Sequence, residues 1–319
     1  MPGNAELVKR VYVSELKNFF HLRQVSGNEE SLHRWIIAPD VNRPGLELAG
    51  YRDSDDLKRV VIIGNKECKY LQGIDAETQR ERFQIITDSY TPCIIMTGGN
   101  KASDILLEVA RSKNFPVFES EHKSYMATQN IVAFLSRGLA PETDMYGVML
   151  EVYGLGILIT GDSAIGKSEL ALEMIRRGHT FLADDRVEIA RVQNELRCRA
   201  PILLKGMLEI RGIGIIDVNS MFGASAMLDE CRLDLVIHLE NYDESHEYKR
   251  LIYEEKNLNI LGIDRPYVEI PVTPARSLGI LIEAAVSNYR LIQRGYNSTE
   301  AFNQRVYNAI QAKNRGERK

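Results

Sequence analysis

The apolar residues of the N-terminal half fall into short runs separated by helical patterns. The runs at residues 60–63, 93–96 and 116–118 predict buried strands, because each is short and continuously apolar. Helical patterns cover residues 75–86, 102–112 and 123–136. This alternation of strands and helices predicts a small α/β domain with parallel strands.

The C-terminal half is richer in strands. Helical patterns cover residues 169–177, 277–294 and 298–312. Strands are predicted at residues 147–152, 156–160, 180–183, 187–191, 196–198, 233–239 and 267–270. We therefore predict two domains: residues 1–134 form an N-terminal α/β domain of unassigned role, and residues 135–319 form a β-rich domain with C-terminal helices.

A phosphate-binding motif lies between the strand at 156–160 and the helix that follows it. Its pattern is G-x-x-x-x-G-K-S, the P-loop. The residues are Gly161, Asp162, Ser163, Ala164, Ile165, Gly166, Lys167 and Ser168. Glycines allow the backbone to turn tightly and present N–H groups to phosphate, and the helix start adds unpaired donors. The fold class is thus α/β, with a small N-terminal α/β domain and a C-terminal P-loop domain that has a β-rich core; a P-loop kinase domain is one form of this architecture.

Two side chains of this motif carry charge or metal chemistry. Lys167 places an ammonium on the outer phosphates of a nucleotide, and the Ser168 hydroxyl is a hard oxygen ligand suited to Mg²⁺. The alternative is a chance match in a glycine-containing turn. The flanking strand and helix argue against that alternative, so we expect the chain to bind a nucleotide or another polyphosphate.

Composition narrows the class of protein. The chain has 319 residues, 44% of them hydrophobic and 26% charged, which is typical of a globular protein. The net charge of −4 gives no broad basic field for nucleic acid. No membrane-spanning run or signal peptide is expected, and the four scattered cysteines read as buried reduced thiols. We expect a cytoplasmic protein that binds neither nucleic acid nor a membrane.

Acidic and basic residues suited to phosphoryl transfer follow the P-loop. Asp184 and Asp185 end the strand at 180–183; if it lies beside the P-loop strand, one carboxylate could hold metal and the other accept a proton. The alternative is an acidic turn.

A second group of charged residues lies in the glycine-rich segment 209–217, whose glycines predict a close-approach loop. Glu209 is a candidate metal ligand there, and Arg211 is a candidate charge partner. A structural ion pair is the alternative there.

Two arginines are candidates for stabilising a migrating phosphoryl group. Arg250 follows the acidic stretch after residue 239, and Arg276 ends a proline-rigidified loop. The alternative is that each is a surface arginine.

With these residues in place, the chain resembles the bacterial HPr kinase/phosphorylase family over most of its length. The resemblance rests on the P-loop, the D-D-x-V-E-I segment at 184–189, the E-I-R-G-x-G-I-I-D segment at 209–217, the Y-x-R-L segment at 248–251 and the proline-bracketed loop at 271–276. An R-P-G-L-E-L-x-G element at 43–50 adds to it.

The resemblance implies phosphorylation of a serine on the phosphocarrier protein HPr by ATP or pyrophosphate, and regulation of carbon metabolism. It also implies the reverse phosphorolysis, in which phosphate attacks seryl-phosphorylated HPr and pyrophosphate is released. Lys167 would contact the phosphates, and Ser168 and Glu209 would bind Mg²⁺. Asp185 would be the base in phosphorylation, and Arg250 would stabilise the transferring group. A homohexamer and a dephosphorylation loop are implied as well; the loop residues are Pro271, Val272, Thr273, Pro274, Ala275 and Arg276.

The sequence departs from the family pattern at four positions. Tyr146 stands where the family has a catalytic histidine, and a tyrosine is not a cation near neutral pH. Ala164 replaces a common P-loop glycine, and Thr273 and Ala275 replace an arginine and a glycine. We therefore expect a competent kinase with weakened or altered phosphorolysis. Two alternatives remain: a P-loop kinase of a small metabolite, and a nucleotide-sensing module without catalysis.

Overall fold

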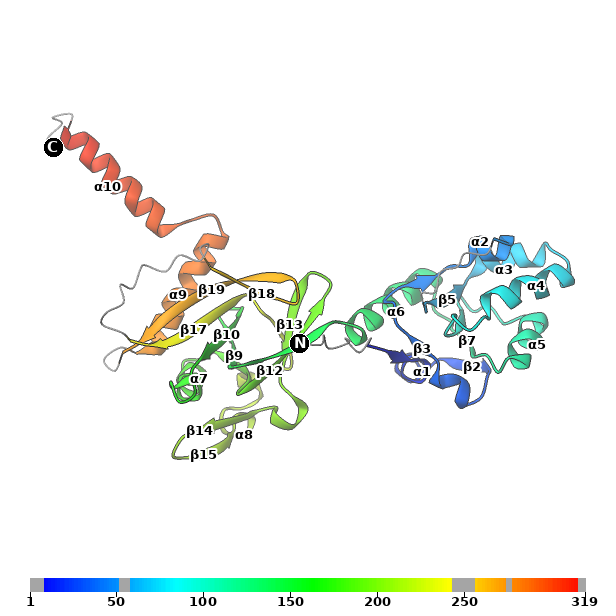
Figure 1. The fold of residues 1–319 in the computed structure, drawn as a ribbon, viewed down its shortest axis with the longest axis horizontal. Helices are drawn as coiled ribbons and strands as arrows, with labels where there is room; N and C mark the ends of the chain where they lie inside the picture. The colour runs from blue at the N-terminus through cyan, green and yellow to red at the C-terminus, as the bar shows by residue number, and fades with distance from the viewer. Residues whose placement is uncertain (1–8, 52–57, 243–255, 274–276, 315–319) are drawn as a thin grey trace, which may run out of the picture. The chain divides into compact units, whose positions relative to one another are not determined.

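The computed structural model describes residues 9–51, 58–242, 256–273 and 277–314. The chain divides into two compact units, residues 1–141 and 142–319 (Figure 1). The predicted boundary after residue 134 is therefore too early, because it falls inside helix α6 (Ser124–Gly138). That helix is continuous, and its Ile131 and Leu135 are buried in the core of the first unit, so the whole helix belongs there.

The first unit is built on a five-stranded sheet with the order β2-β7-β6-β5-β4. Strands β4 to β7 are parallel, and β2 is antiparallel to β7. The strands are β2 (Arg23–Ser26), β4 (Val41–Asn42), β5 (Val60–Ile63), β6 (Ile94–Met96) and β7 (Val117–Glu119), beside a small ladder of β1 (Val11–Tyr12) and β3 (Trp35–Ile36). The predicted strands and their parallel arrangement are confirmed.

Helices cover both faces of this sheet. They are α1 (Val13–Phe20), α2 (Gly45–Ala49), α3 (Asn65–Gln72), α4 (Ala76–Ile86), α5 (Asp104–Ser112) and α6. One face packs against α1 and α6, and the other against α4 and α5, because successive strand residues point to opposite faces. The sequence pattern missed α3, of which only Leu71 is buried, so it carries no apolar stripe.

The second unit is built on a six-stranded sheet with the order β11-β9-β10-β17-β19-β18. Strands β10, β17 and β19 are parallel, whereas β9 runs antiparallel to both of its neighbours. The strands are β9 (Val148–Val152), β10 (Leu155–Gly161), β11 (Thr180–Ala183), β17 (Leu235–Asn241), β18 (Asn257–Ile260) and β19 (Ile263–Val272).

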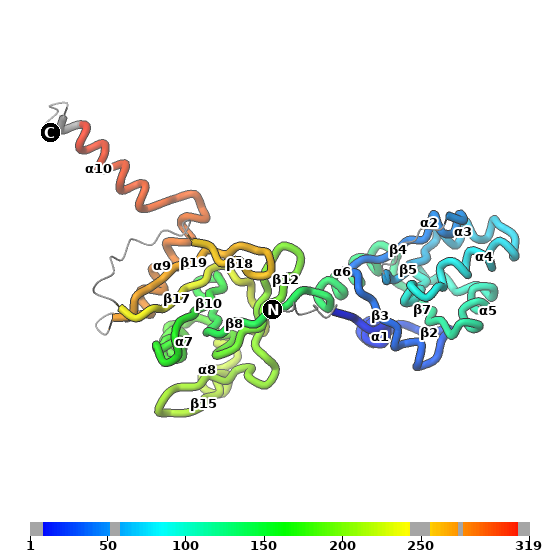
Figure 2. The backbone as a smooth tube through the Cα atoms, in the orientation of Figure 1, coloured from blue at the N-terminus to red at the C-terminus, as the bar shows by residue number. Residues whose placement is uncertain are grey.

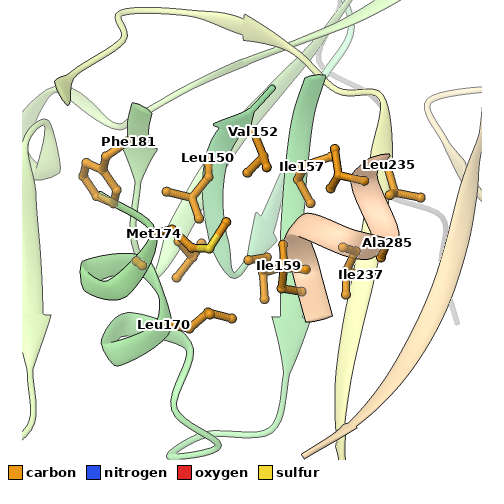
Figure 3. Close-up of a cluster of buried hydrophobic side chains, with 14 of the residues drawn as sticks. Leu150, Val152, Ile157, Ile159, Leu170, Met174, Phe181, Leu235, Ile237 and Ala285 are labelled. Carbon is orange, nitrogen blue, oxygen red and sulfur yellow. The ribbon is translucent and has the colours of Figure 1, made fainter. Parts of the chain in front are cut away.

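The two faces of this sheet are covered differently. Helices α7 (Lys167–Arg176) and α9 (Leu278–Gln293) pack on one face, where Leu170 and Met174 meet Leu150 and Ile159 (Figure 3). A second sheet packs on the other face; its strands, in order, are β16 (Cys231–Arg232), β13 (Glu195–Arg199), β12 (Arg186–Val192) and β8 (Glu142–Tyr146). The crowding of strands around one P-loop helix follows the sequence prediction.

Residues 207–217 form a hairpin rather than the predicted loop. Strands β14 (Met207–Ile210) and β15 (Gly214–Asp217) pair in antiparallel register and lead into α8 (Val218–Phe222). The prediction was wrong because the glycines lie at the turn: Gly212 and Gly214 have φ values of 83° and 104° and reverse the chain. The last described element is α10 (Ser298–Asn314), and the path of the backbone can be followed in Figure 2.

Candidate active site

The P-loop leaves the end of β10 and enters the start of α7, as the sequence predicted. Three of its residues have positive φ: Gly161 (143°), Ala164 (66°) and Gly166 (99°). A Cβ atom on Gly161 would lie 2.5 Å from the carbonyl oxygen of Leu239 in the neighbouring strand β17. The first glycine is therefore required both by backbone angle and by the close approach of the two strands.

Lys167 lies across its own loop. Its Nζ atom donates hydrogen bonds to the carbonyl oxygens of Gly161 (2.8 Å) and Asp162 (2.7 Å). An ammonium group has three donors, so these two bonds orient the group and leave one donor for a phosphate. The side chain is thus fixed at the mouth of the loop.

The Ser168 hydroxyl contacts a carboxylate from a different strand. Its Oγ atom lies 3.2 Å and 3.0 Å from Oδ1 and Oδ2 of Asp184, directly after β11. Asp184 is 8% exposed, and its burial raises the pKa of the carboxyl group, although hydrogen bonds from Ser168 and the Glu209 N–H act in the opposite direction. Strand β9 lies between β11 and the P-loop strand β10, so these two strands are not adjacent, in contrast to the arrangement considered from the sequence. Asp184 meets Ser168 because Ser168 lies in the first turn of α7.

Asp185 differs from Asp184 in its surroundings. It is exposed and has a φ of 67°, and its carbonyl oxygen accepts a hydrogen bond from the Gly147 N–H at 3.0 Å. Tyr146, which directly precedes Gly147, is 76% exposed and pairs in register with Arg186 of the neighbouring strand. The structure therefore brings Asp185 and Tyr146 to the same edge of the unit and points Asp184 alone at Ser168.

The β14–β15 hairpin reaches the site through its main chain. The Glu209 N–H donates to Asp184 Oδ2 at 3.3 Å, whereas the Glu209 side chain is exposed. Arg211 has no carboxylate within 4.0 Å among the described residues, so the alternative of a structural ion pair with Glu209 is not observed. Asp217 caps α8 by accepting from the Ser220 N–H at 3.0 Å, and this hydrogen bond lowers its pKa.

Several predicted site residues follow the strand ends at the same edge. Pro271 and Val272 end β19, which runs parallel to β17 with Glu240 opposite Pro271, and Thr273 follows. Because β10, β17 and β19 are parallel, their carboxyl ends lie at one edge with the P-loop. Four predicted residues lie outside the described residues: Arg250, Pro274, Ala275 and Arg276.

The sequence did not single out Asp184 as the partner of Ser168. It offered the acidic pair as a whole and gave a definite role only to Asp185. The available signal was the apolar run 181–183, which buries the residue that follows it. Asp184 and the Ser168 hydroxyl supply the hard oxygen donors that fit Mg²⁺, an ion usually held by one or two carboxylates together with phosphates and water. No cluster of three His, Cys, Asp or Glu side chains suited to a metal occurs among the described residues.

A strand, a phosphate-binding loop, a helix and a carboxylate on the loop's serine together define a P-loop phosphotransferase. The family described as "HPr Serine kinase C-terminal domain" matches residues 137–306, and "HPr Serine kinase N terminus" matches residues 11–135. The chain belongs to the HPr serine kinase family.

Curated relatives match along nearly the whole chain. An HPr kinase/phosphorylase of Bacillus cereus (strain AH820) is 37% identical over 306 residues, covering 96% of this chain and 99% of the relative. One from Exiguobacterium sp. is 39% identical over 302 residues, covering 94% and 97%. A solved structure, the Hpr(Ser) kinase/phosphatase from Coxiella burnetii, is 35% identical and covers 48% of this chain and 99% of its own, with a TM-score of 0.44.

Among the described residues, no helix has the length and apolarity needed to span a membrane.

Proposed function

We propose that this protein transfers a phosphoryl group from ATP, or from pyrophosphate, to a serine of HPr. We propose further that it catalyses phosphorolysis of seryl-phosphorylated HPr, in which phosphate is the acceptor and pyrophosphate the product. The observation that carries the proposal is the Ser168–Asp184 contact beside the Lys167 ammonium, which its own loop holds in place. The chain that contains it is 37% identical to a curated HPr kinase/phosphorylase. That arrangement supports phosphate binding and charge neutralisation at one edge of the sheet.

Each residue of the site has a role in the proposed reaction. Lys167 contacts the phosphates with the donor that its loop leaves unused. Ser168, Glu209 and the buried Asp184 carboxylate would hold Mg²⁺, whose charge would offset that of the phosphates. Asp185 is proposed as the base that takes the proton of the seryl hydroxyl, and as the acid in the reverse direction. Its exposure suits a group that must meet a protein acceptor.

The remaining roles follow from the family. Arg250 would stabilise the transferring phosphoryl group, and residues 271–276 would serve dephosphorylation. Tyr146 takes the place of the family histidine; its phenol can donate a hydrogen bond but brings no positive charge to an incoming phosphate. We therefore propose that phosphorolysis is weakened relative to the kinase reaction.

HPr is the proposed protein partner, and a homohexamer is the proposed assembly. The absence of nucleic-acid and membrane partners and the cytoplasmic location stay predictions from the sequence. No described feature favours a metabolite kinase or a catalytically silent sensor, and both are tested as outcomes below.

The test combines HPr, Mg²⁺ and γ-labelled ATP with the wild type and with Asp185→Asn. We expect label on the HPr serine, a loss of about 10²–10⁴-fold in Asp185→Asn, and no change in Asp229→Asn, whose exposed carboxylate pairs with Lys205. Excess phosphate should then release pyrophosphate slowly, and Tyr146→His should speed this release. ATP binding without labelled HPr would reject the proposed acceptor, and equal rates in both directions would reject the weakened phosphorolysis.

A further inference from the structure

A polar hollow lies at the edge of the main sheet opposite the P-loop. Its volume is about 390 Å³, and it is formed where β17 and β19 begin and α9 ends. This volume falls in the range of about 300–1,000 Å³ that small-molecule sites occupy. The lining that matters here consists of Asn194, Arg232, Asp234, Arg265, Tyr289 and Gln293.

Arg265 places a positive charge in this hollow without a carboxylate to balance it. Its Nε donates to the Leu233 carbonyl at 2.7 Å, and its Nη1 donates to the Asp264 carbonyl at 3.0 Å. Among the described residues, no carboxylate oxygen lies within 4.0 Å of this guanidinium. These two bonds fix the plane of the half-buried group and leave the Nη2 donors without a described partner.

The neighbouring charges of the hollow are already paired. Asp234 is 8% exposed and accepts from Arg232 Nε (2.8 Å) and Nη2 (2.7 Å), and its second oxygen accepts from the Gly156 N–H at 2.9 Å. Glu195, which also lines the hollow, pairs with Arg197 at 2.5 Å and lies 3.8 Å from Arg232. The two acidic and two basic lining residues balance in number, and Arg265 is the lining guanidinium that has no carboxylate within 4.0 Å among the described residues.

The rest of the wall is polar and neutral. Tyr289 donates to the Asp234 carbonyl at 3.4 Å, and Asn194 and Gln293 add amide groups. Burial raises the pKa of the Tyr289 hydroxyl, while a hydrogen bond with the Gln293 side chain and the charges of Arg265 and Arg232 act in the opposite direction. The hollow therefore offers a fixed cation surrounded by hydrogen-bonding groups.

We propose that this hollow binds a small organic anion whose carboxylate or phosphate group is held by Arg265 and whose polar body meets the amides of Asn194 and Gln293. A guanidinium forms charge-assisted hydrogen bonds with either group, so the two ligand classes share one recognition chemistry. The site is separate from the P-loop, and the proposal stands or fails independently of the phosphoryl-transfer function.

The test is isothermal titration of the full-length protein with citrate and, separately, with glycerol 2-phosphate, as carboxylate and phosphate probes. Lys167→Ala is used as the background in every titration, so that the P-loop contributes little to anion binding. We expect at least one probe to bind, and Arg265→Gln to weaken it at least tenfold. Arg199→Gln, which removes a charge on β13 outside the hollow, should change the affinity less than twofold.

Gln293→Glu is the second variant. It is needed because Arg265 donates a hydrogen bond to the Leu233 carbonyl, so replacing Arg265 can disturb the fold. Gln293 is exposed on α9, so the substitution adds a charge that repels an anion without removing a buried side chain, and a glutamate oxygen can still accept a hydrogen bond from Tyr289. The same tenfold loss is expected. Failure of both probes to bind, or binding that both variants leave unchanged, would overturn the proposal; binding of one probe alone identifies the ligand class.

Discussion

The hydrogen bond between Ser168 and Asp184 should contribute measurably to stability before any ligand binds. Two oxygens of Asp184 lie within 3.2 Å of Ser168 Oγ, but a hydroxyl has one proton, so the contact counts as a single bond. A hydrogen bond to an ionised group contributes about 1.5–3 kcal/mol. At about 2–4 °C per kcal/mol for a unit of this size, Ser168→Ala should lower the melting temperature by about 3–12 °C.

Asp184→Asn should behave differently because the amide oxygen still accepts from Ser168. Since burial raises the folded-state pKa of Asp184, its ionised form destabilises the fold above that pKa, and the penalty disappears as pH falls through it. A neutral asparagine removes the penalty at every pH. We expect Asp184→Asn to melt no lower than the wild type at pH 7.5 while losing phosphoryl transfer, and Ser168→Ala in that background to lose only about 0.5–1.5 kcal/mol.

The assay is thermal unfolding of the wild type, both single variants and the double variant, without nucleotide or metal. Ser163→Ala is the matched control, since this exposed serine of the same loop makes no described hydrogen bond. Lowering the pH should narrow the gap between the wild type and Ser168→Ala, because a protonated Asp184 accepts only a neutral hydrogen bond. A Ser168→Ala melting temperature within about 1 °C of the wild type at pH 7.5 would refute the reasoning.

Three further predictions concern backbone and thiol chemistry. Ala164→Gly should raise stability by up to about 1.6 kcal/mol, because the left-handed φ of 66° costs about 1–2 kcal/mol and glycine loses about 0.4–1 kcal/mol through the unfolded chain. A lower melting temperature would contradict this. Gly156→Ala should lower the free energy of unfolding by more than about 3 kcal/mol, because its Cβ would lie 1.7 Å from the Arg232 carbonyl oxygen. Gly45→Ala is the control in the same unfolding measurement, because a Cβ there would have no atom within 4 Å. Burial raises the pKa of Cys93 to about 12, so at pH 8 its thiol should react with a disulfide reagent only after unfolding; a rapid native reaction at Cys93, located by peptide mapping, would be inconsistent with its burial.

Much of the local structure follows from the sequence. The strand at 180–183 was predicted with its observed bounds, and α9 and α10 to within two residues, because hydrophobic periodicity and capping residues act over a few neighbours. The P-loop was found for the same reason: its glycines and lysine occupy fixed local positions. The hairpin at 207–217 was missed because a glycine can end a strand or interrupt it, and spacing alone does not distinguish the two.

Other features of the site depend on contacts between distant segments. Strand β9, and not β11, lies beside the P-loop strand in the sheet. Asp184, which follows β11, therefore contacts Ser168 on helix α7 and not a residue of an adjacent strand. The sequence also placed Asp184 and Asp185 together, although the backbone turns them to different surroundings. The hollow at Arg265 corresponds to no sequence motif, because its lining residues come from separate segments of the chain.

The sequence by itself determined the elements, the phosphate-binding loop and the chemistry available at each position. Only the tertiary structure decided which strand edges pair, which carboxylate is buried against the serine and which arginine of the hollow has no carboxylate beside it among the described residues. Strand pairing brings together residues far apart in the chain, and competing edges have similar local patterns. The choice among them therefore depends on burial and packing of the whole unit, which no short stretch of sequence records.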